Sequence, residues 1–192
     1  LTIPSDLLPA DGRFGCGPSK VRQEQIDHLA SASRTILGTS HRQAPVRDLV
    51  GRVRTGLGEL FQVAEGYEVI MGNGGSTAFW DAAAFALIER RSAHLSFGEF
   101  GSKFAKAAAA PHLESPHVVS APGGSFAELD NISGADVFAY PHNETSTGVM
   151  APVRRFNDTN VLTVVDATSA AGGIQLDAAQ ADVYYFAPQK NF

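Results

Sequence analysis

The chain has 192 residues, of which 44% are apolar and 18% are charged, and its formal net charge is −5. This length suits one domain with a sizeable core, and the acidic balance predicts no nucleic-acid partner. The single cysteine excludes a disulfide framework and suits a reducing cytoplasm. No signal peptide or apolar run of membrane-spanning length is present, so no membrane partner is expected. The first residue is not Met, which suggests trimming or an incomplete N-terminus.

The first third of the chain is predicted to hold an irregular segment and two helices. Residues 1–18 are interrupted by prolines and glycines. A helix is predicted from Ser19 to about Ser33, with Ser19 as its N-cap. The polar segment 38–42 separates it from a second helix, in which Pro45 suits the first turn and apolar residues recur with helical spacing.

From residue 66 onward, short apolar runs alternate with helical patterns. Strands are predicted at 67–71, 94–97, 116–120, 137–140, 161–166 and 183–186, and helices at 76–89 and 100–110. Several of the strands are apolar on both faces, which is typical of a parallel sheet covered by helices. The predicted fold class is therefore α/β, a three-layer sandwich with a mostly parallel sheet in one domain.

The loop Gly72-Asn73-Gly74-Gly75-Ser76-Thr77 joins a predicted strand to a helix. Its glycines allow the backbone to approach a phosphate, the helix N-terminus presents free N–H groups, and the hydroxyls of Ser76 and Thr77 add donors. The alternative is a tight turn with a hydroxyl capping the helix. Because the loop lacks a P-loop lysine and the dinucleotide glycine spacing, a nucleotide site is disfavoured.

Three other loops at predicted strand ends carry candidate ligand groups. Phe100 can stack on a flat heterocycle, or it can be an ordinary core residue. Thr145 can hydrogen-bond a phenolic oxygen, or it can belong to a polar turn. Asp166 closes an apolar strand, and because a buried unpaired carboxylate is costly it needs a partner. That partner is either a pyridinium N–H, a lysine or a helix N-terminus.

The last loop, Ala187-Pro188-Gln189-Lys190-Asn191-Phe192, follows an apolar run. A lysine in a short loop after a buried strand, 24 residues beyond Asp166, is the layout of a pyridoxal phosphate site. The amine reaches one carbon of the cofactor while the carboxylate keeps the pyridine nitrogen protonated. Lys190 alone is compatible with an exposed loop lysine. Five loops at the same ends of successive strands, however, favour a cofactor site together.

Outside these loops, His41 and Arg42 can bind an anionic substrate, although solvated surface charge is the alternative. The six histidines show no ligand spacing, so no metal site is predicted. Cys16 is expected to be a small buried residue rather than a nucleophile.

The motifs resemble those of the phosphoserine aminotransferases, which are class-V aminotransferases of pyridoxal phosphate fold type I. The likeness runs through nearly the whole chain. It rests on four segments: Arg-Phe-Gly-Cys-Gly-Pro at 13–18, Thr-Ser-His-Arg at 39–42, Asn-Glu-Thr at 143–145 and Gln-Lys-Asn at 189–191. Many family members have Gly-Gly-Gly-Arg-Gly where this chain has Gly-Gly-Ser-Thr at 74–77, and many have Trp where it has Phe100.

The resemblance implies a role for each candidate residue. Lys190 would hold pyridoxal 5′-phosphate covalently and act as the catalytic base, Asp166 would pair with the ring nitrogen, Thr145 with the ring hydroxyl, and Phe100 would stack on the ring. The implied cofactor-phosphate ligands are Gly75, Ser76, Thr77, Thr168 and Gln189. The implied ligands of the substrate phosphate are His41 and Arg42.

The implied reaction is amino transfer between L-glutamate and 3-phosphohydroxypyruvate, giving phosphoserine and 2-oxoglutarate. The enzyme would be a cytoplasmic homodimer of serine and pyridoxine biosynthesis. Alternatives are another class-V aminotransferase, of the alanine–glyoxylate or serine–pyruvate type, or a non-catalytic truncated fragment. Because family members are about twice as long, residues 19–192 are expected to form part of the large domain. The C-terminal small domain would then be absent from this chain, and the fragment alone would be inactive.

Overall fold

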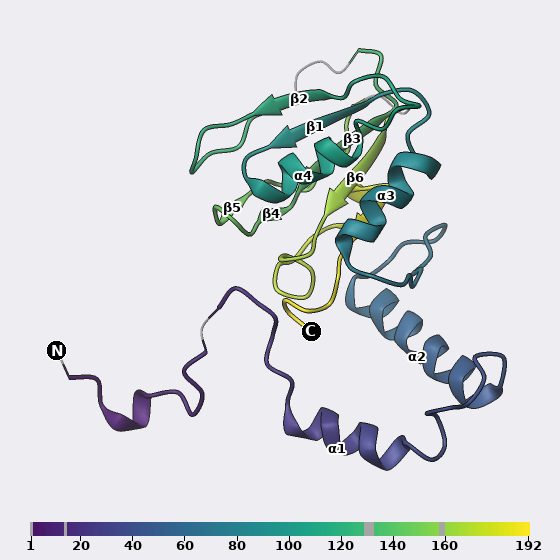
Figure 1. Cartoon of the computed structure of the whole chain (residues 1–192), viewed down its shortest axis with the longest axis vertical. Helices are drawn as coiled ribbons and strands as arrows, with labels where there is room; N and C mark the ends of the chain where they lie inside the picture. The colour runs from purple at the N-terminus through teal and green to yellow at the C-terminus, as the bar shows by residue number, and fades with distance from the viewer. Residues whose placement is uncertain (1, 14, 129–132, 158–159) are drawn as a thin grey trace.

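A five-stranded parallel sheet forms the centre of the molecule. The computed structural model describes residues 2–13, 15–128, 133–157 and 160–192 (Figure 1). The strands follow the order β2-β1-β3-β6-β7, and every neighbouring pair is parallel. Their bounds are Ser92–Ser96 (β1), His117–Ser120 (β2), Val137–Pro141 (β3), Leu162–Asp166 (β6) and Val183–Tyr185 (β7). The predicted α/β class with a parallel sheet is confirmed.

Two helices pack on the sheet and two do not. The helices are α1 (Gln23–Ala32), α2 (Ala44–Leu60), α3 (Ser76–Ala86) and α4 (Glu99–Ala107), with short 3-10 turns η1 (Ser5–Leu7) and η2 (Ala178–Gln180). Figure 1 shows α3 and α4 against one face of the sheet, whereas α1 and α2 stand apart from it. Neither α1 nor α2 contains a buried residue. The sheet with α3 and α4 therefore holds the core.

The core is divided between the two faces of the sheet. Alternate strand residues point to opposite faces, so Val164 belongs to the cluster under α3 and α4 and Val165 to the cluster on the other face. The helix-side cluster includes Trp80, Phe104, Val137, Ala139, Val164 and Tyr185. The opposite cluster is covered by loops, whose Phe126, Val153 and Phe156 pack against it. The three layers are thus helices, sheet and loops.

The predicted strand at 67–71 is wrong. This segment has no partner strand among the described residues, and Ile70 is 83% exposed. β7 is an edge strand of the described sheet, and the segment 67–71 does not pair with it. An apolar run becomes a strand only where a neighbour satisfies its backbone N–H and C=O groups.

The helix starts and stops also differ from the prediction. Ser19 does not cap α1, because its N–H donates to the Gln189 carbonyl over 2.6 Å and its hydroxyl to the Phe192 carbonyl over 2.7 Å. The first helix therefore begins at Gln23. α3 ends at Ala86 instead of residue 89, since the Asp136 carboxylate accepts from the next backbone N–H groups and turns the chain toward β1.

A two-stranded hairpin between β3 and β6 was not predicted. β4 (Asn143–Glu144) and β5 (Val149–Met150) pair antiparallel in the polar loop after β3. Two residues per strand are too few to show a period of two in the sequence. The hairpin matters because it carries the Asn-Glu-Thr segment.

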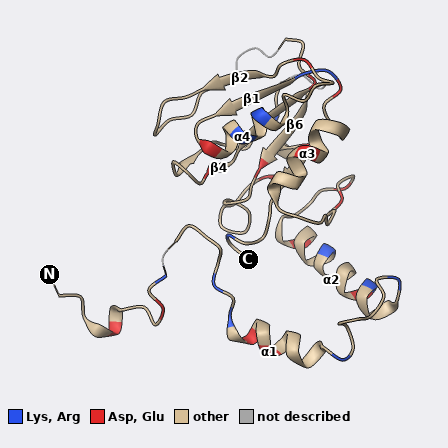
Figure 2. Ribbon diagram, viewed as in Figure 1, with Lys and Arg blue, Asp and Glu red and all other residues tan. Residues whose placement is uncertain are grey.

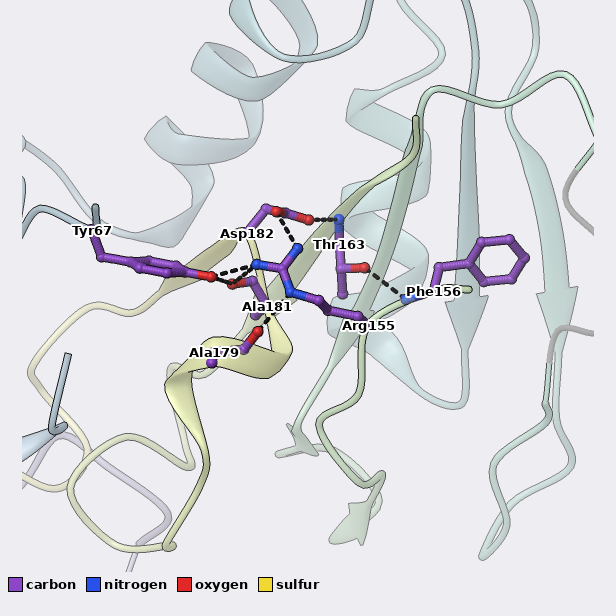
Figure 3. Close-up of polar contacts among 7 residues, drawn as sticks. All are labelled: Tyr67, Arg155, Phe156, Thr163, Ala179, Ala181 and Asp182. Atoms are coloured by element: carbon purple, nitrogen blue, oxygen red, sulfur yellow. Dashed lines mark hydrogen bonds and ion pairs between the residues drawn. The ribbon is translucent and has the colours of Figure 1, made fainter. Parts of the chain in front are cut away.

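Arg155 joins Tyr67 to the segment 179–182, which leads into β7 (Figure 3). Its Nε donates to the Ala179 carbonyl over 2.6 Å, and its other nitrogens contact the Asp182 carboxylate and the Tyr67 hydroxyl. The other Asp182 oxygen accepts from the Thr163 N–H over 2.8 Å, which ties the start of β7 to β6. This cluster, the Arg155 hub, fixes where β7 begins.

The surface charges are mixed. Figure 2 shows lysines, arginines and acidic residues interspersed over the helices and loops. Within the described part of the chain, no helix combines the length and apolar character needed to cross a bilayer.

Candidate active site

Three of the predicted ligand loops meet at the carboxyl-terminal edge of the sheet. In the β-ladder Asp166 lies beside Pro141 of β3 on one side and Tyr185 of β7 on the other. The loops that follow are joined across the strand ends, because the His142 N–H donates to the Asp166 carbonyl and the Ala167 N–H to the Tyr185 carbonyl, each over 2.8 Å. In parallel sheets this edge is where ligands bind.

Asp166 is a buried carboxylate with a donor on each oxygen. It is 9% exposed. The Thr168 N–H donates to Oδ1 and the Tyr185 hydroxyl to Oδ2, each over 2.9 Å. Burial raises the pKa of Asp166 above its ordinary value, and the hydrogen bonds from Thr168 and Tyr185 oppose that rise. The carboxylate can therefore accept a hydrogen bond from one further donor at this edge.

The start of α3 lies beside the turn that follows β6. The hydroxyls of Ser76 and Thr168 are 2.5 Å apart. Gly75 is the N-cap and offers no side chain to the first turn, so the N–H groups there remain available to an anion. Gly74 has φ +95°, and a Cβ at this position would fall 2.8 Å from the Ala78 Cβ. Two predicted phosphate ligands are thus brought together on a helix N-terminus.

Phe100 and Asp166 line the same small pocket. Its other walls include His94 and Tyr140, and its volume is about 10 Å³. Phe100 lies in the first turn of α4 and is half-buried. A ring between Phe100 and the carboxylate would therefore require this pocket to open.

Glu144 positions the start of α4, a role that sequence reasoning missed. Its side chain is fully buried. Oε2 accepts from the N–H groups of Phe100 and Gly101, each over 3.0 Å, and Oε1 accepts from the Ser146 hydroxyl over 2.7 Å. A carboxylate on the free N–H groups of a helix start is favourable. Glu144 therefore holds in place the helix turn that carries Phe100.

The close approach of Glu144 to α4 requires a glycine at position 98. A Cβ on Gly98 would lie 2.3 Å from the Glu144 Cγ and 2.4 Å from the Ser146 Oγ. The signal in the sequence was present but ambiguous, because an acidic residue in a polar loop is more often solvated. Thr145 follows Glu144 and is half-buried. It therefore lies in the hairpin turn that approaches α4.

Lys190 lies in the loop after β7 and is half-buried. Its Nζ donates to the Cys16 carbonyl over 2.8 Å. Gly17 has φ +139°, and a Cβ there would fall 2.7 Å from the Lys190 Cδ, so only glycine fits against the lysine. The N-terminal segment was predicted to be irregular, but its contact with the lysine loop was not foreseen.

Cys16 corrects one expectation. Its thiol is exposed rather than buried, since the segment that carries it crosses the surface of the lysine loop instead of entering the core. The Sγ lies 3.9 Å from the Lys190 Nζ.

His41 and Arg42 are not brought to this edge. Both are exposed in the turn between α1 and α2. Figure 1 shows that turn well away from the carboxyl-terminal strand ends. Gln189 and Thr77 are also exposed. The backbone carbonyl of Gln189 accepts a hydrogen bond from the Ser19 N–H. The side-chain roles of these four residues remain predictions.

Two histidines at the site are held neutral by burial. His94 lines the pocket with Phe100, and its Nε2 is 2.9 Å from the Ser92 hydroxyl. Burial lowers the pKa of His94 from 6.5 to about 4. Burial also lowers the pKa of His142, whose Nδ1 is 3.1 Å from the Tyr184 hydroxyl. No group of three or more His, Cys, Asp or Glu side chains in the described residues is arranged for a metal ion.

A larger cavity of about 680 Å³ lies on the loop-covered face of the sheet. Its walls include Leu95, Phe138, Tyr140 and Arg154, and none of the predicted site residues lines it. This cavity shares Leu95 and Tyr140 with the small pocket beside Asp166.

Comparison with known proteins places the chain in a family. The model of the aminotransferase class-V family matches residues 16–192. A phosphoserine aminotransferase from Nocardioides sp. (strain ATCC BAA-499 / JS614) is 60% identical over 196 residues, covering 100% of this chain and 52% of the relative. A protein from Mycobacterium sp. (strain KMS) is 62% identical over 194 residues with the same coverage. The chain thus spans about half the length of the curated relatives it matches.

Solved structures agree on the fold. A phosphoserine aminotransferase from Cytophaga hutchinsonii ATCC 33406 matches with a TM-score of 0.83 and 26% identity, over 91% of this chain and 50% of that one. A pyridoxal phosphate-bound phosphoserine aminotransferase from Trichomonas vaginalis matches with a TM-score of 0.74 and 21% identity, over 93% and 54%. At the latter identity the likeness concerns the fold alone. From the family match and these relatives we conclude that the chain belongs to the class-V aminotransferases.

Proposed function

We propose that the complete protein carrying this chain is a pyridoxal phosphate-dependent aminotransferase acting on phosphoserine and 2-oxoglutarate, and on their counterparts glutamate and 3-phosphohydroxypyruvate. The observation that carries the proposal is the buried Asp166 carboxylate at the sheet edge, with the Lys190 loop following the adjacent strand. The relative from Nocardioides, at 60% identity, bears the name of that enzyme.

The donor set of this edge fits the cofactor. The N-terminus of α3 with the hydroxyls of Ser76 and Thr168 suits a phosphate, and Asp166 is a buried acceptor suited to a protonated ring nitrogen. When bound, pyridoxal phosphate would supply the electron sink for breaking a bond to the amino-acid α-carbon.

The chain's own residues would perform the remaining steps. Lys190 would hold the cofactor covalently and then move the α-proton as a general base. Asp166 would accept the ring N–H, while Thr145 would orient the ring hydroxyl and Phe100 would cover one ring face. Gly75, Thr77 and Gln189 would add contacts to the cofactor phosphate, and Glu144 keeps Phe100 in place.

Substrate contacts and assembly belong to the same proposal. His41 and Arg42 would meet the substrate phosphate, since a guanidinium suits such an anion. The enzyme would act as a homodimer in the cytoplasm, in serine and pyridoxine biosynthesis. The residues 1–18 would form an entry segment to a partial large domain at 19–192, with the small domain supplied by chain beyond these residues.

The proposal is tested by Lys190→Ala in the complete protein, with Lys106→Ala as the matched control, since Lys106 is exposed in the last turn of α4. We expect Lys190→Ala to lose the visible absorbance of bound cofactor and at least 10³-fold in transamination rate, on the order expected for removal of a covalent catalyst. The control should keep both. Retention of both properties by Lys190→Ala would contradict the proposal.

Another class-V aminotransferase is the closest rival. An alanine–glyoxylate aminotransferase from Nostoc sp. shares the fold, with a TM-score of 0.73 at 18% identity. Rates with phosphoserine and with alanine as amino donors separate the two. We expect phosphoserine to be preferred, and Arg42→Ala to reduce the phosphoserine rate more than the alanine rate. A preference for alanine would favour the rival.

A further inference from the structure

Three buried groups form a chain of hydrogen bonds that ends on Asp166. The Trp80 Nε1 is 2.7 Å from the Tyr185 hydroxyl, and this hydroxyl is 2.9 Å from the Asp166 Oδ2. Trp80 is 5% exposed and Tyr185 is 8% exposed. Trp80 comes from α3 and Tyr185 from β7, so the chain connects the helix layer to the strand that leads to Lys190.

The direction of these hydrogen bonds is fixed by chemistry. An indole N–H can only donate, so the Tyr185 oxygen accepts from Trp80. The hydroxyl proton of Tyr185 is then directed to its other neighbour, which is the Asp166 Oδ2. Because the Thr168 N–H donates to Oδ1, both carboxylate oxygens act as acceptors. This arrangement favours the ionised carboxylate.

Aromatic packing keeps the Tyr185 ring in this orientation. It stacks on Phe79 with ring centroids 4.0 Å apart and meets the edge of Phe104 at 6.1 Å. Trp80 in turn stacks on Phe104, with a centroid distance of 6.0 Å. The hydroxyl is therefore held at the carboxylate by a packed aromatic cluster.

Ionisation of Asp166 needs this help because the carboxylate is buried. Burial raises the pKa of Asp166, and the Tyr185 hydrogen bond is among the contacts that lower it. An acid that gained a proton here would no longer accept the N–H of a pyridinium ring. The same helix that carries Trp80 begins at Ser76, one turn earlier, where the cofactor phosphate is expected.

We propose that Tyr185, oriented by Trp80, is a positioning residue that keeps Asp166 ionised and aimed at the ring nitrogen of the cofactor. The inference rests on the proposed function and deepens it. A hydrogen bond to a charged group changes an equilibrium constant by about tenfold. Loss of the hydroxyl should therefore raise the dissociation constant of the cofactor about tenfold. It should change the equilibrium constant for protonation of the ring nitrogen by about the same factor.

The test compares Tyr185→Phe with Tyr184→Phe in the complete protein. Tyr184 is the next residue along β7, and its hydroxyl faces His142 on the opposite side of the sheet. We expect Tyr185→Phe to raise the cofactor dissociation constant about tenfold. It should also shift the pH midpoint of the visible band of the bound cofactor upward by about one unit. Tyr184→Phe leaves both hydrogen bonds to the Asp166 carboxylate in place and should change both quantities much less.

The outcomes separate a positioning role from a merely structural one. A folded Tyr185→Phe variant with unchanged dissociation constant and unchanged pH midpoint would overturn the inference, even if its melting temperature falls. If Tyr185→Phe does not fold, Trp80→Phe decides, because it keeps the tyrosine hydroxyl but removes the donor that orients it. That variant should shift the pH midpoint in the same direction by a smaller amount, and no shift would again overturn the inference.

Failure of the proposed function would look different. In that case Lys190→Ala would keep the visible band of the cofactor. The band could then not report on a cofactor bound to Lys190 in the Tyr185→Phe and Tyr184→Phe variants. If Lys190→Ala loses the band while Tyr185→Phe behaves as wild type, only the positioning role is wrong.

Discussion

The buried titratable residues determine how the site responds to pH. His94 is 1% exposed, and its ring contacts Phe104 edge-on at 5.0 Å. Asp166 is also buried at the pocket it shares with His94. The sequence showed Asp166 as a candidate, because a carboxylate ends an apolar strand. It did not show that His94 would be buried, since an isolated histidine in a strand carries no signal of which face it occupies.

His94 should make stability depend on pH between 6.5 and 4. Its folded pKa of about 4 lies below the unfolded value of 6.5, so the unfolded state binds the proton more strongly in this window. Stability is full above 6.5 and falls as the pH drops toward 4, by about 3 kcal/mol for this group. Urea unfolding at several pH values measures the slope. His94→Gln should flatten it, and an equally steep slope in the variant would exclude His94 as the cause.

Glu144 should contribute to stability through the start of α4. Glu144→Gln keeps one oxygen but turns an NH₂ group toward backbone N–H donors, which leaves buried groups unpaired. We expect a loss of about 1–3 kcal/mol in the free energy of unfolding. Glu99→Gln, an exposed change in the same helix turn, is the control and should cost much less. Urea unfolding checks both, and equal small losses would mean that Glu144 does not hold the helix.

At the scale of elements, a strand or helix could be predicted where the hydrophobic pattern of the sequence matches the contacts that the segment makes in the fold. The five paired strands fall within a few residues of the predicted runs, and α3 and α4 start close to their predicted positions. The segment 67–71 had the right composition but no neighbour with which to pair. Ser19 had the right residue type for a helix cap, but a contact with the distant Phe192 engages its hydroxyl. Such long-range competition is not visible in a local pattern.

The Arg155 hub should set the anchoring of β7. Arg155→Lys would keep the charge but lose the fork that reaches Asp182, Tyr67 and the Ala179 carbonyl together (Figure 3). We expect a loss of about 1–2 kcal/mol in the free energy of unfolding. The loss is smaller than for a fully buried ion pair, because Arg155 and Asp182 are partly exposed to solvent.

Arg154→Lys is the matched control for that change. Arg154 pairs with Glu128, and both side chains of this pair are more than half exposed. Its replacement should alter the free energy of unfolding by less than about 0.5 kcal/mol. Chemical denaturation measures the free energy of unfolding of both variants. Equal losses would contradict the role of the Arg155 hub in anchoring β7.

At the scale of the whole molecule, the described chain covers only part of the proposed enzyme. Its curated relatives are about twice its length, since it covers 52% of them. α1 and α2 bury no residue, although Ile26 and Leu29 of α1 and Val50 and Val53 of α2 are apolar and exposed. The family could be inferred from the sequence because its motifs lie in loops. The placement of His41 and Arg42 could not, since no local pattern tells where the α1–α2 turn will lie.

The 192 residues alone should bind the cofactor more weakly than the complete protein. Trp80 is the single tryptophan of the chain and contacts the proposed site through Tyr185. Quenching of its fluorescence during titration with pyridoxal phosphate reports binding. We expect a dissociation constant at least on the order of tenfold above that of the complete protein, with no measurable turnover. Equal affinity and efficient turnover would show that these residues form a whole site.

The central claim is that the Lys190 amine and the Asp166 carboxylate act on one cofactor ring. Reductive trapping with borohydride, followed by peptide mass mapping of the complete protein loaded with pyridoxal phosphate, tests it most directly. We predict the phosphopyridoxyl mass on the peptide containing Lys190 and a strong loss of that label in Asp166→Ala. A label confined to Lys20, Lys103 or Lys106, or a label on Lys190 that does not depend on Asp166, would contradict the account.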